Sequence, residues 1–239
     1  MLDFNRFEWL TFDCYGTLID WEAGLLPVLR RFLENHSQHL EDAEILEFYG
    51  HFEQVAESGE YRSYSDVLRC VMQSFGVELK FVPAEDELNF LVRSLPCWNP
   101  WPDTVAALRF LKSRFQLAIL SNIDDDLFAS TRPHLEIEFD HVITAQQARA
   151  YKPSHRIFEL AFQRIGTPRD RILHVGQSVF HDVVPAQALG LAAVRVNRPS
   201  ARAGVGAVKK AVAKPDLEVP DLATLAQYAR QNSDSRTRG

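Results

Sequence analysis

Cysteine is scarce in this sequence, and its pattern excludes several classes of protein. The 239 residues contain three cysteines, Cys14, Cys70 and Cys97, which are widely spaced and form no Cys-x-x-Cys pair. An odd and scattered set of this kind argues against a disulfide framework and against a structural zinc site. We therefore expect reduced thiols that serve as small apolar side chains in a cytoplasmic protein.

Long hydrophobic runs and an excess of positive charge are also missing. No apolar segment approaches the ~20 residues that span a bilayer. Residues 1–6 show no basic region leading into an apolar one, so we expect no signal peptide. The formal net charge of −6 gives no support for nucleic acid or an anionic membrane as a partner.

The composition that remains is that of an ordinary globular domain. Hydrophobic residues make up 46% and charged residues 24% of the chain, as is usual for soluble proteins. The length suits one large domain or a domain with an insertion. The organising stretch is residues 9–20, an apolar run that ends at Asp13 and continues into a turn containing Gly16. It predicts a buried strand whose end presents a carboxylate to a crevice.

A change of periodicity divides the rest of the chain into two parts. Residues 20–95 place apolar residues at helical spacing in about four segments, without a strand pattern. From residue 104 onwards, short apolar strands alternate with helices, which predicts a parallel sheet with right-handed crossovers. The predicted fold is α/β, with a helical block inserted after the first strand. The predicted strands are residues 8–13, 117–121, 141–144, 171–175 and 193–196, and a last helix covers 222–231.

Polar and charged residues follow four of these strands, at the ends that meet along one edge of a parallel sheet. Asp13 is the candidate nucleophile, because a neighbouring Lys152 lowers the pKa of its carboxyl and keeps it ionised. Asp182 holds Lys152 or orients a water. Each residue alone also has an ordinary role as a cap or a surface charge, and we expect His181 to face solvent; their convergence favours a site. The residues that converge are Asp13, Tyr15, Thr17, Ser121, Asn122, Lys152, Gln177, Ser178 and Asp182.

The same segments resemble the four motifs of the haloacid dehalogenase (HAD) superfamily. They are, in order, residues 12–18, 120–122, 151–153, and 176–178 followed by 181–182. The resemblance extends over residues 8–198 and implies a Rossmann-like HAD core with a cap domain. The change of periodicity and the polar end of the chain predict the boundaries: 1–19 and 96–231 for the core, 20–95 for the cap, and 232–239 for a disordered tail.

Two positions distinguish the subfamilies that this resemblance covers. Phosphatases of the superfamily carry an aspartate where this chain has Tyr15, and a magnesium-binding acid where it has Gln177. Asp13 and Asp182 remain as ligands of a weak Mg²⁺ site. The segment Asp-x-Tyr-Gly-Thr is similar instead to the (S)-2-haloacid dehalogenases, which are metal-free. Their mechanism implies that Asp13 displaces the halide to form an ester, which water then hydrolyses.

The chain also departs from the dehalogenase pattern. Gln177 and Val179 replace a Ser-x-Asn pair, Phe158 replaces a tyrosine, and no cap arginine lies around residues 49–51. Arg62 is the candidate substitute for that arginine. Thr17 joins Asp13, Lys152 and Asp182 as a catalytic candidate. The other substrate-binding candidates are Tyr15, Ser121, Asn122 and Gln177, and the candidates that position water are Gln177 and His181.

The leading hypothesis is therefore a dehalogenase-like hydrolase that acts on small anionic 2-haloacids without a cofactor. A magnesium-dependent small-molecule phosphatase is the first alternative. A catalytically silent HAD-like protein that binds a ligand or partner through the cap is the second. The resemblance also implies a homodimer, and we expect neither nucleic acid nor a membrane as a partner.

Overall fold

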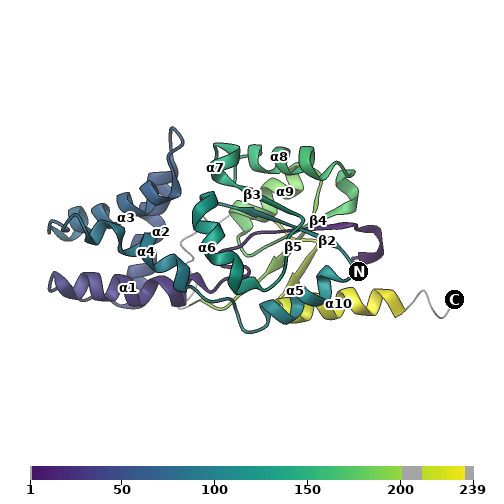
Figure 1. Cartoon of the computed structure of the whole chain (residues 1–239), viewed down its shortest axis with the longest axis horizontal. Helices are drawn as coiled ribbons and strands as arrows, with labels where there is room; N and C mark the ends of the chain where they lie inside the picture. Colours follow the sequence, from purple (N-terminus) through teal and green to yellow (C-terminus); the bar gives the residue numbers. More distant parts are fainter. Residues whose placement is uncertain (1, 201–211, 235–239) are drawn as a thin grey trace.

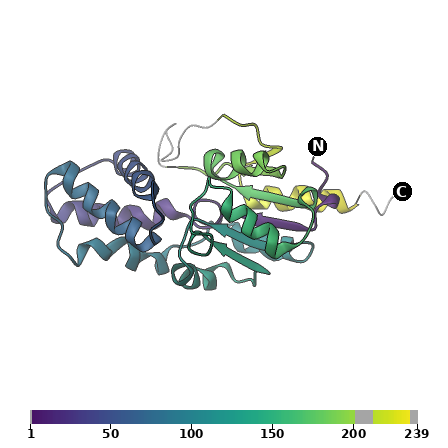
Figure 2. The same cartoon turned by 90° about the horizontal axis from the view of Figure 1, so that it is seen from above.

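The computed structural model describes residues 2–200 and 212–234. Within these ranges an α/β core and a block of helices lie end to end along the long axis of the molecule, and both views agree on this arrangement (Figures 1 and 2). The helical block follows the first strand in the chain, as the change of periodicity predicts. In the described ranges no helix is both long and apolar enough to cross a membrane.

The core is built on a parallel sheet, which in the described ranges has six strands in the order β3-β2-β1-β4-β5-β6. Strand β1 is central, and Phe12 at its end lies opposite Ile119 on β2 and Val175 on β4. The chain therefore leaves β1 in the middle of the carboxyl edge. The strands are β1 Trp9–Phe12, β2 Gln116–Ser121, β3 His141–Thr144, β4 Ile172–Gly176, β5 Ala192–Val196 and β6 Leu217–Val219.

Helices cover both faces of the sheet (Figure 1). Successive residues of a strand point to opposite faces, so Leu10 and Phe12 join one buried cluster while Trp9 joins the other. The first face packs against α5 (Thr104–Lys112), α6 (Asp125–Leu135) and α10 (Leu222–Asp234). The second packs against α8 (Arg156–Ile165) and α9 (Val184–Ala188). Shorter elements are the helix α7 (Ala145–Ala148), a π turn (Val179–Val183) and two 3₁₀ turns (Phe4–Arg6, Arg169–Arg171).

Four helices form the inserted block, which we call the cap. Local capping defines where its long helices start: Asp20 accepts a hydrogen bond from the amide of Ala23, and Ser63 accepts one from the amide of Asp66. The cap helices are α1 Trp21–Asn35, α2 Asp42–Glu57, α3 Tyr64–Leu79 and α4 Phe90–Ser94, with 3₁₀ turns at Glu87–Asn89 and Leu95–Cys97. The exact domain boundaries stay a prediction.

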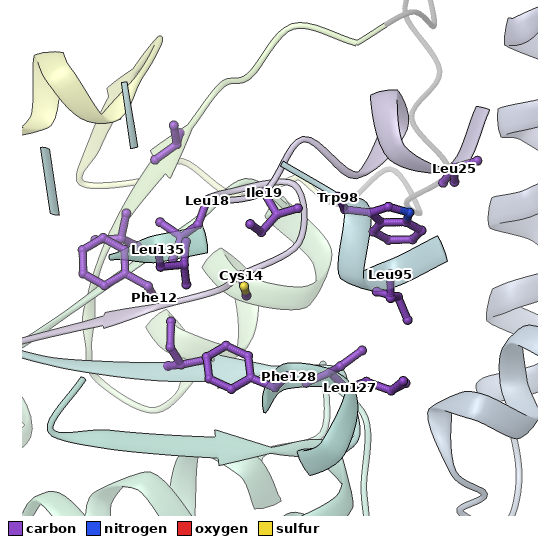
Figure 3. Packing of buried hydrophobic residues seen from close by; sticks show 14 of the residues in the cluster. Phe12, Cys14, Leu18, Ile19, Leu25, Leu95, Trp98, Leu127, Phe128 and Leu135 are labelled. Atoms are coloured by element: carbon purple, nitrogen blue, oxygen red, sulfur yellow. The ribbon is translucent and has the colours of Figure 1, made fainter. Parts of the chain in front are cut away.

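Buried apolar residues run without interruption from the core into the cap (Figure 3). Trp98, on the chain that returns from the cap, packs so closely on α1 that a Cβ at Gly24 would lie 2.4 Å from its ring. Cys14 points into this cluster beside Leu18 and Ile19 (Figure 3). Burial raises the pKa of the Cys14 thiol well above its usual range, so Cys14 is a core residue.

The α/β prediction and the sheet of five or more strands are confirmed, with differences at the ends of the chain. Strand β6 was not predicted, because three residues are too few to show a period of two. Helix α10 continues to Asp234, so residues 232–234 of the expected tail are helical. Residues 235–239 of that tail lie outside the described residues.

Candidate active site

A cavity of about 90 Å³ lies between the carboxyl edge of the sheet and the cap, and this size suits a small molecule. We call its two sides the core edge and the cap wall; Trp98 lines it at the junction between them. The cap wall consists of Trp21, Tyr49, Glu53, Glu57 and Tyr64. The core edge consists of Asp13, Tyr15, Ser121, Asn122, Lys152, Gln177, Ser178, His181 and Asp182.

Asp13 follows the last residue of β1 and is fixed by its neighbours. Its backbone amide donates to the carbonyl of Val175 at 3.0 Å, which continues the sheet pairing for one residue. Thr17 Oγ1 donates to Asp13 Oδ2 at 2.6 Å and accepts from the amide of Gln177 at 2.9 Å. Thr17 is fully buried, so its hydroxyl orients the Asp13 carboxylate without Thr17 itself lining the cavity.

Lys152 links the two acids of the core edge. Its ammonium donates to Asp13 Oδ1 at 2.9 Å, to Asp182 Oδ1 at 2.7 Å and to the carbonyl of Leu120 at 3.0 Å. The side chain of Asn122 holds this segment, accepting from the amide of Lys152 at 2.7 Å and donating to its carbonyl at 3.3 Å. All three N–H groups of the ammonium are therefore used within the protein.

Asp182 is held from the opposite side by the end of β4. The amide of Ser178 donates to Asp182 Oδ2 at 3.1 Å, and His174 Nε2 lies 3.4 Å from Oδ1. Gly176 allows this approach, because a Cβ there would lie 2.4 Å from the carboxyl carbon of Asp182. The absence of a side chain at Gly176 therefore lets Asp182 pack against the end of β4, where it reaches the ammonium of Lys152.

The electrostatics of this triad follow from burial and from the shared ammonium. Burial raises the pKa of Asp13, while the charge of Lys152 lowers it. Lys152 therefore lowers the pKa of Asp13, as the sequence predicted, but burial outweighs this effect and the net pKa of Asp13 is raised. Lys152 lowers the pKa of Asp182, whereas the two carboxylates raise the pKa of Lys152. We infer a charged ammonium with an ionised Asp182 beside it.

Ser121, at the end of β2, differs from its neighbours because its hydroxyl is free. The residue is 1% exposed, and its Oγ has no hydrogen-bond partner in the described part of the chain. A buried hydroxyl without a partner costs free energy unless a ligand satisfies it. Since Ser121 lines the cavity, a bound molecule is the natural partner for this group.

Tyr15 and Gln177 complete the core edge as expected from the motifs. The hydroxyl of Tyr15 lies 2.7 Å from Thr131 Oγ1, and its ring packs edge-on against Trp98. The side-chain oxygen of Gln177 lies so close to Gly16 that a Cβ there would be 2.2 Å away. Gly16 also has φ +98°, which disfavours other residues.

Two residues lie elsewhere than the sequence predicted. Arg62 does not line the cavity; its side chain is exposed and donates to Cys70 Sγ at 3.2 Å. Its position therefore does not support a role in binding substrate. His181 was expected to face solvent, but it lines the cavity beside Asp182. Burial lowers the pKa of His181 to about 4, so its imidazole is neutral at pH 7.

The cap wall contains residues that the sequence analysis did not select, namely the acids Glu53 and Glu57. They follow Tyr49 at intervals of four residues on α2, and such residues share one face of a helix. Because Tyr49 lies among the apolar residues at helical spacing in the segment 20–95, acids in line with it were the available signal. Of the cap and hinge aromatics, Trp21, Tyr49, Tyr64 and Trp98 line the cavity.

A model of the family described as haloacid dehalogenase-like hydrolase matches residues 7–190. This chain belongs to that family. Asp13, Lys152 and Asp182 of this hydrolase all lie within the matched segment. The match confirms the family resemblance of the four motifs and the hydrolase class.

Individual relatives of this hydrolase are dehalogenases. It is 28% identical to (S)-2-haloacid dehalogenase H-109 of Pseudomonas putida, over 92% of this chain and 97% of the relative. It is also 28% identical to haloacetate dehalogenase H-2 of a Moraxella species, over 81% and 87% of the two chains. The structure of the L-2-haloacid dehalogenase from Xanthobacter autotrophicus with covalently bound chloropropionic acid superimposes with a TM-score of 0.78, at 22% identity over 94% and 98%. That likeness confirms the fold.

The donor set of this site does not fit a magnesium ion. Each carboxylate oxygen of Asp13 and Asp182 already accepts a hydrogen bond from within the protein. The ammonium of Lys152 lies between the two acids and bonds to both. The described residues contain no group of three or more His, Cys, Asp and Glu side chains that is arranged to hold a metal. Mg²⁺ requires near-octahedral oxygen ligands, and with Gln177 in place of an acid the core edge offers no third carboxylate.

Proposed function

We propose that this hydrolase removes halide from small 2-haloalkanoic acids, with Asp13 as the nucleophile. The observation that carries the proposal is the buried set of Asp13, Lys152 and Thr17 at the cavity, combined with a tyrosine at position 15. Lys152 and Thr17 each bind one oxygen of the Asp13 carboxylate. A carboxylate held in this way is suited to attack an electrophilic carbon, and displacement of a halide needs no acid at Tyr15.

The first step forms an ester on the enzyme. A carboxylate oxygen of Asp13 attacks the carbon that bears the halogen, a C–O bond forms, and the halide leaves with the electron pair of the C–X bond. The free hydroxyl of Ser121 donates to the substrate carboxylate and satisfies its own hydrogen-bonding need. The covalently bound chloropropionic acid in the Xanthobacter relative supports an intermediate of this kind.

The second step hydrolyses the ester. Water attacks the carboxyl carbon of Asp13, and the bond between that carbon and the ester oxygen breaks. One proton of the water passes to the departing oxygen, so that the 2-hydroxyacid leaves, and the other is released as Asp13 returns to a carboxylate. The charged ammonium of Lys152 stabilises the negative charge that develops on the carbonyl oxygen. The neutral imidazole of His181 lines the same cavity and accepts a hydrogen bond from the attacking water, while Gln177 positions that water from the turn after β4.

No metal takes part in this proposal, because the oxygens of the two acids are bound within the protein and Lys152 lies between them. A magnesium-dependent phosphatase requires those oxygens as ligands. It also requires a general acid, for which this chain offers Tyr15, whose pKa is raised well above its usual range by burial.

The test is halide release from (S)-2-chloropropionate with and without EDTA, followed by a single turnover in H₂¹⁸O. We expect release that EDTA does not affect, and ¹⁸O that enters the Asp13 carboxylate before it reaches the product. Activity restricted to phosphate esters with Mg²⁺ would overturn the proposal. Absence of turnover on broad panels of both substrate classes would instead favour a silent binding protein.

We also propose a cytoplasmic homodimer. The cysteines of the chain are free thiols, which suits a reducing compartment. The dimer rests on the family resemblance, and light scattering of the purified protein tests it.

A further inference from the structure

The cap wall presents acids to a cavity in which an anion is expected to leave. Glu53 and Glu57 lie one helical turn apart on α2, and both line the cavity. Among the described residues that line it, Lys152 is the only lysine or arginine. Its ammonium is fully used by Asp13, Asp182 and a backbone carbonyl, so no cation of the cap wall can receive a halide.

The two acids differ in how they are bound. Glu53 Oε1 accepts hydrogen bonds from the hydroxyls of Tyr49 at 2.9 Å and Tyr64 at 2.6 Å. These bonds occupy the hydroxyl protons of both tyrosines. The side-chain carboxyl of Glu57 makes no hydrogen bond within the described part of the chain. Glu57 is therefore the carboxyl group of the cap wall that remains available to a ligand.

The stereochemistry of the displacement directs the leaving group towards this wall. Backside attack requires that the attacking oxygen, the carbon and the halide lie in line. Since Asp13 lies at the core edge, the halide must point away from it, towards the cap. The departing halide gains negative charge there and requires a hydrogen-bond donor.

On the basis of the dehalogenase function proposed above, we propose that Glu57, as a neutral carboxylic acid, donates a hydrogen bond to the departing halide. The proton stays on Glu57, and the halide leaves as an anion that accepts this hydrogen bond. Burial and the charge of Glu53 raise the pKa of Glu57 well above its usual range, while Lys152 opposes the shift. The neutral form of Glu57 is thereby favoured.

The pH dependence follows from this assignment. Glu57 also lines an adjoining cavity, so titratable and charged groups face it from several elements. They are Glu53, Tyr49 and Tyr64 on the cap; Asp13, Tyr151, Lys152, His181 and Asp182 on the core; and Glu60, Tyr61, Arg149 and Arg156 in the adjoining cavity. Because the donor is the protonated acid, the rate of ester formation is retained below the raised pKa of Glu57 and falls as the pH rises through it.

The experiment compares Glu57→Gln and Glu57→Leu with the wild-type enzyme, using 2-chloro-, 2-bromo- and 2-iodopropionate in single turnovers. Glutamine keeps a neutral donor that does not titrate, so we expect ester formation without the alkaline decline. Leucine removes the donor, and we expect a loss of about 100-fold for chloride. The loss should be smaller for bromide and smallest for iodide, because larger halides accept weaker hydrogen bonds.

The matched control is Glu47→Gln, an exposed acid on the same helix, which should leave all rates unchanged. An equal loss for the three halides in Glu57→Leu, no loss, or an alkaline decline retained in Glu57→Gln would overturn the inference. If leucine prevents folding, the pH profile of the glutamine variant decides alone. Failure of the wild-type enzyme to release any halide would overturn the proposed function instead, which keeps the two failures distinct.

Discussion

The core edge and the cap wall face the same cavity but satisfy their charges in opposite ways. On the core edge, both acids share one ammonium, and every carboxylate oxygen has a partner. On the cap wall, Glu53 is held by two tyrosine hydroxyls and the side-chain carboxyl of Glu57 has no hydrogen bond in the described ranges. The core edge is therefore preorganised for the attack by Asp13, whereas the cap wall keeps the carboxyl of Glu57 available to the ligand.

Because of this contrast, we expect substitutions on the two sides to have different effects on stability and turnover. A saturated network of buried charges tolerates little change, because removal of one partner leaves another buried charge exposed to a low dielectric. Changes on the core edge should therefore affect both stability and turnover. Changes on the cap wall should affect turnover and specificity with little change in stability.

The largest effect should come from Asp13→Asn, which removes the nucleophile and keeps the shape of the side chain. We expect halide release to fall by about 10⁴-fold or more, with no ester detected by intact-protein mass spectrometry. The far-ultraviolet circular dichroism should be unchanged. Asp126→Asn, at an exposed acid of α6, is the control and should keep full activity. Retention of activity within tenfold of the wild type would show that Asp13 is not the nucleophile.

Lys152→Met tests the saturated core edge directly. It leaves Asp13 and Asp182 buried without their cation, so we expect the free energy of unfolding to fall by about 3–5 kcal/mol. Urea denaturation measures this change. Lys112→Met removes a lysine whose ion pair with Asp140 is about one-third exposed on each side, and it should cost less than about 1 kcal/mol. Equal losses in the two variants would contradict the contrast between buried and exposed pairs.

Much of the core edge could be predicted from the sequence because it depends on local rules. A strand end, a glycine turn and a hydroxyl four residues after Asp13 lie close together in any parallel sheet. Adjacent strands then bring Ser121 and Lys152 to the same edge. The cap wall depends instead on how the cap docks on the core, and no local pattern determines that geometry. Arg62 was selected as a cation of the cap, but its turn directs it to Cys70.

Elements of the fold that depend on tertiary contact were also missed by local sequence patterns. Strands of four or more residues were predicted within about one residue of their observed ends. Strand β6, by contrast, pairs through three residues, Leu217–Val219, placed beside β5 by tertiary contact. The expectation for His181 failed because a histidine after a turn is usually exposed, whereas the π turn Val179–Val183 directs this one inward.

Ser121→Ala tests the one core-edge group that differs from its neighbours. The carboxylates and the ammonium of this edge all have hydrogen-bond partners, whereas the Ser121 hydroxyl has none in the described residues. Its loss should therefore change the free energy of unfolding by less than about 1 kcal/mol. We expect KM for 2-chloropropionate to rise about tenfold, because a hydrogen bond to the substrate carboxylate is lost. Ser113→Ala, at an exposed serine that bonds its own helix, should change neither quantity. An unchanged KM in Ser121→Ala would remove this residue from the binding site.

The smallest effect should come from the hydrogen bonds through which the cap docks on the core. Asp124 follows β2 and accepts hydrogen bonds from the amides of Tyr64 and Ser65, at the start of cap helix α3, at 2.9 and 3.0 Å. In Asp124→Ala these amides lose their acceptor, which costs about 1 kcal/mol. Hydrogen exchange of this segment should then quicken by about fivefold.

Ser63→Ala is the matched control, because Ser63 caps the same helix through Asp66 without reaching the core. It should speed exchange at Asp66 but leave KM for the haloacid unchanged, whereas Asp124→Ala should raise KM, since a loosened cap no longer holds the cap wall against the core edge. Faster exchange at Tyr64 and Ser65 without a change in KM would mean that cap docking does not position the cap wall. The contrast between the two sides would then rest on their side chains alone.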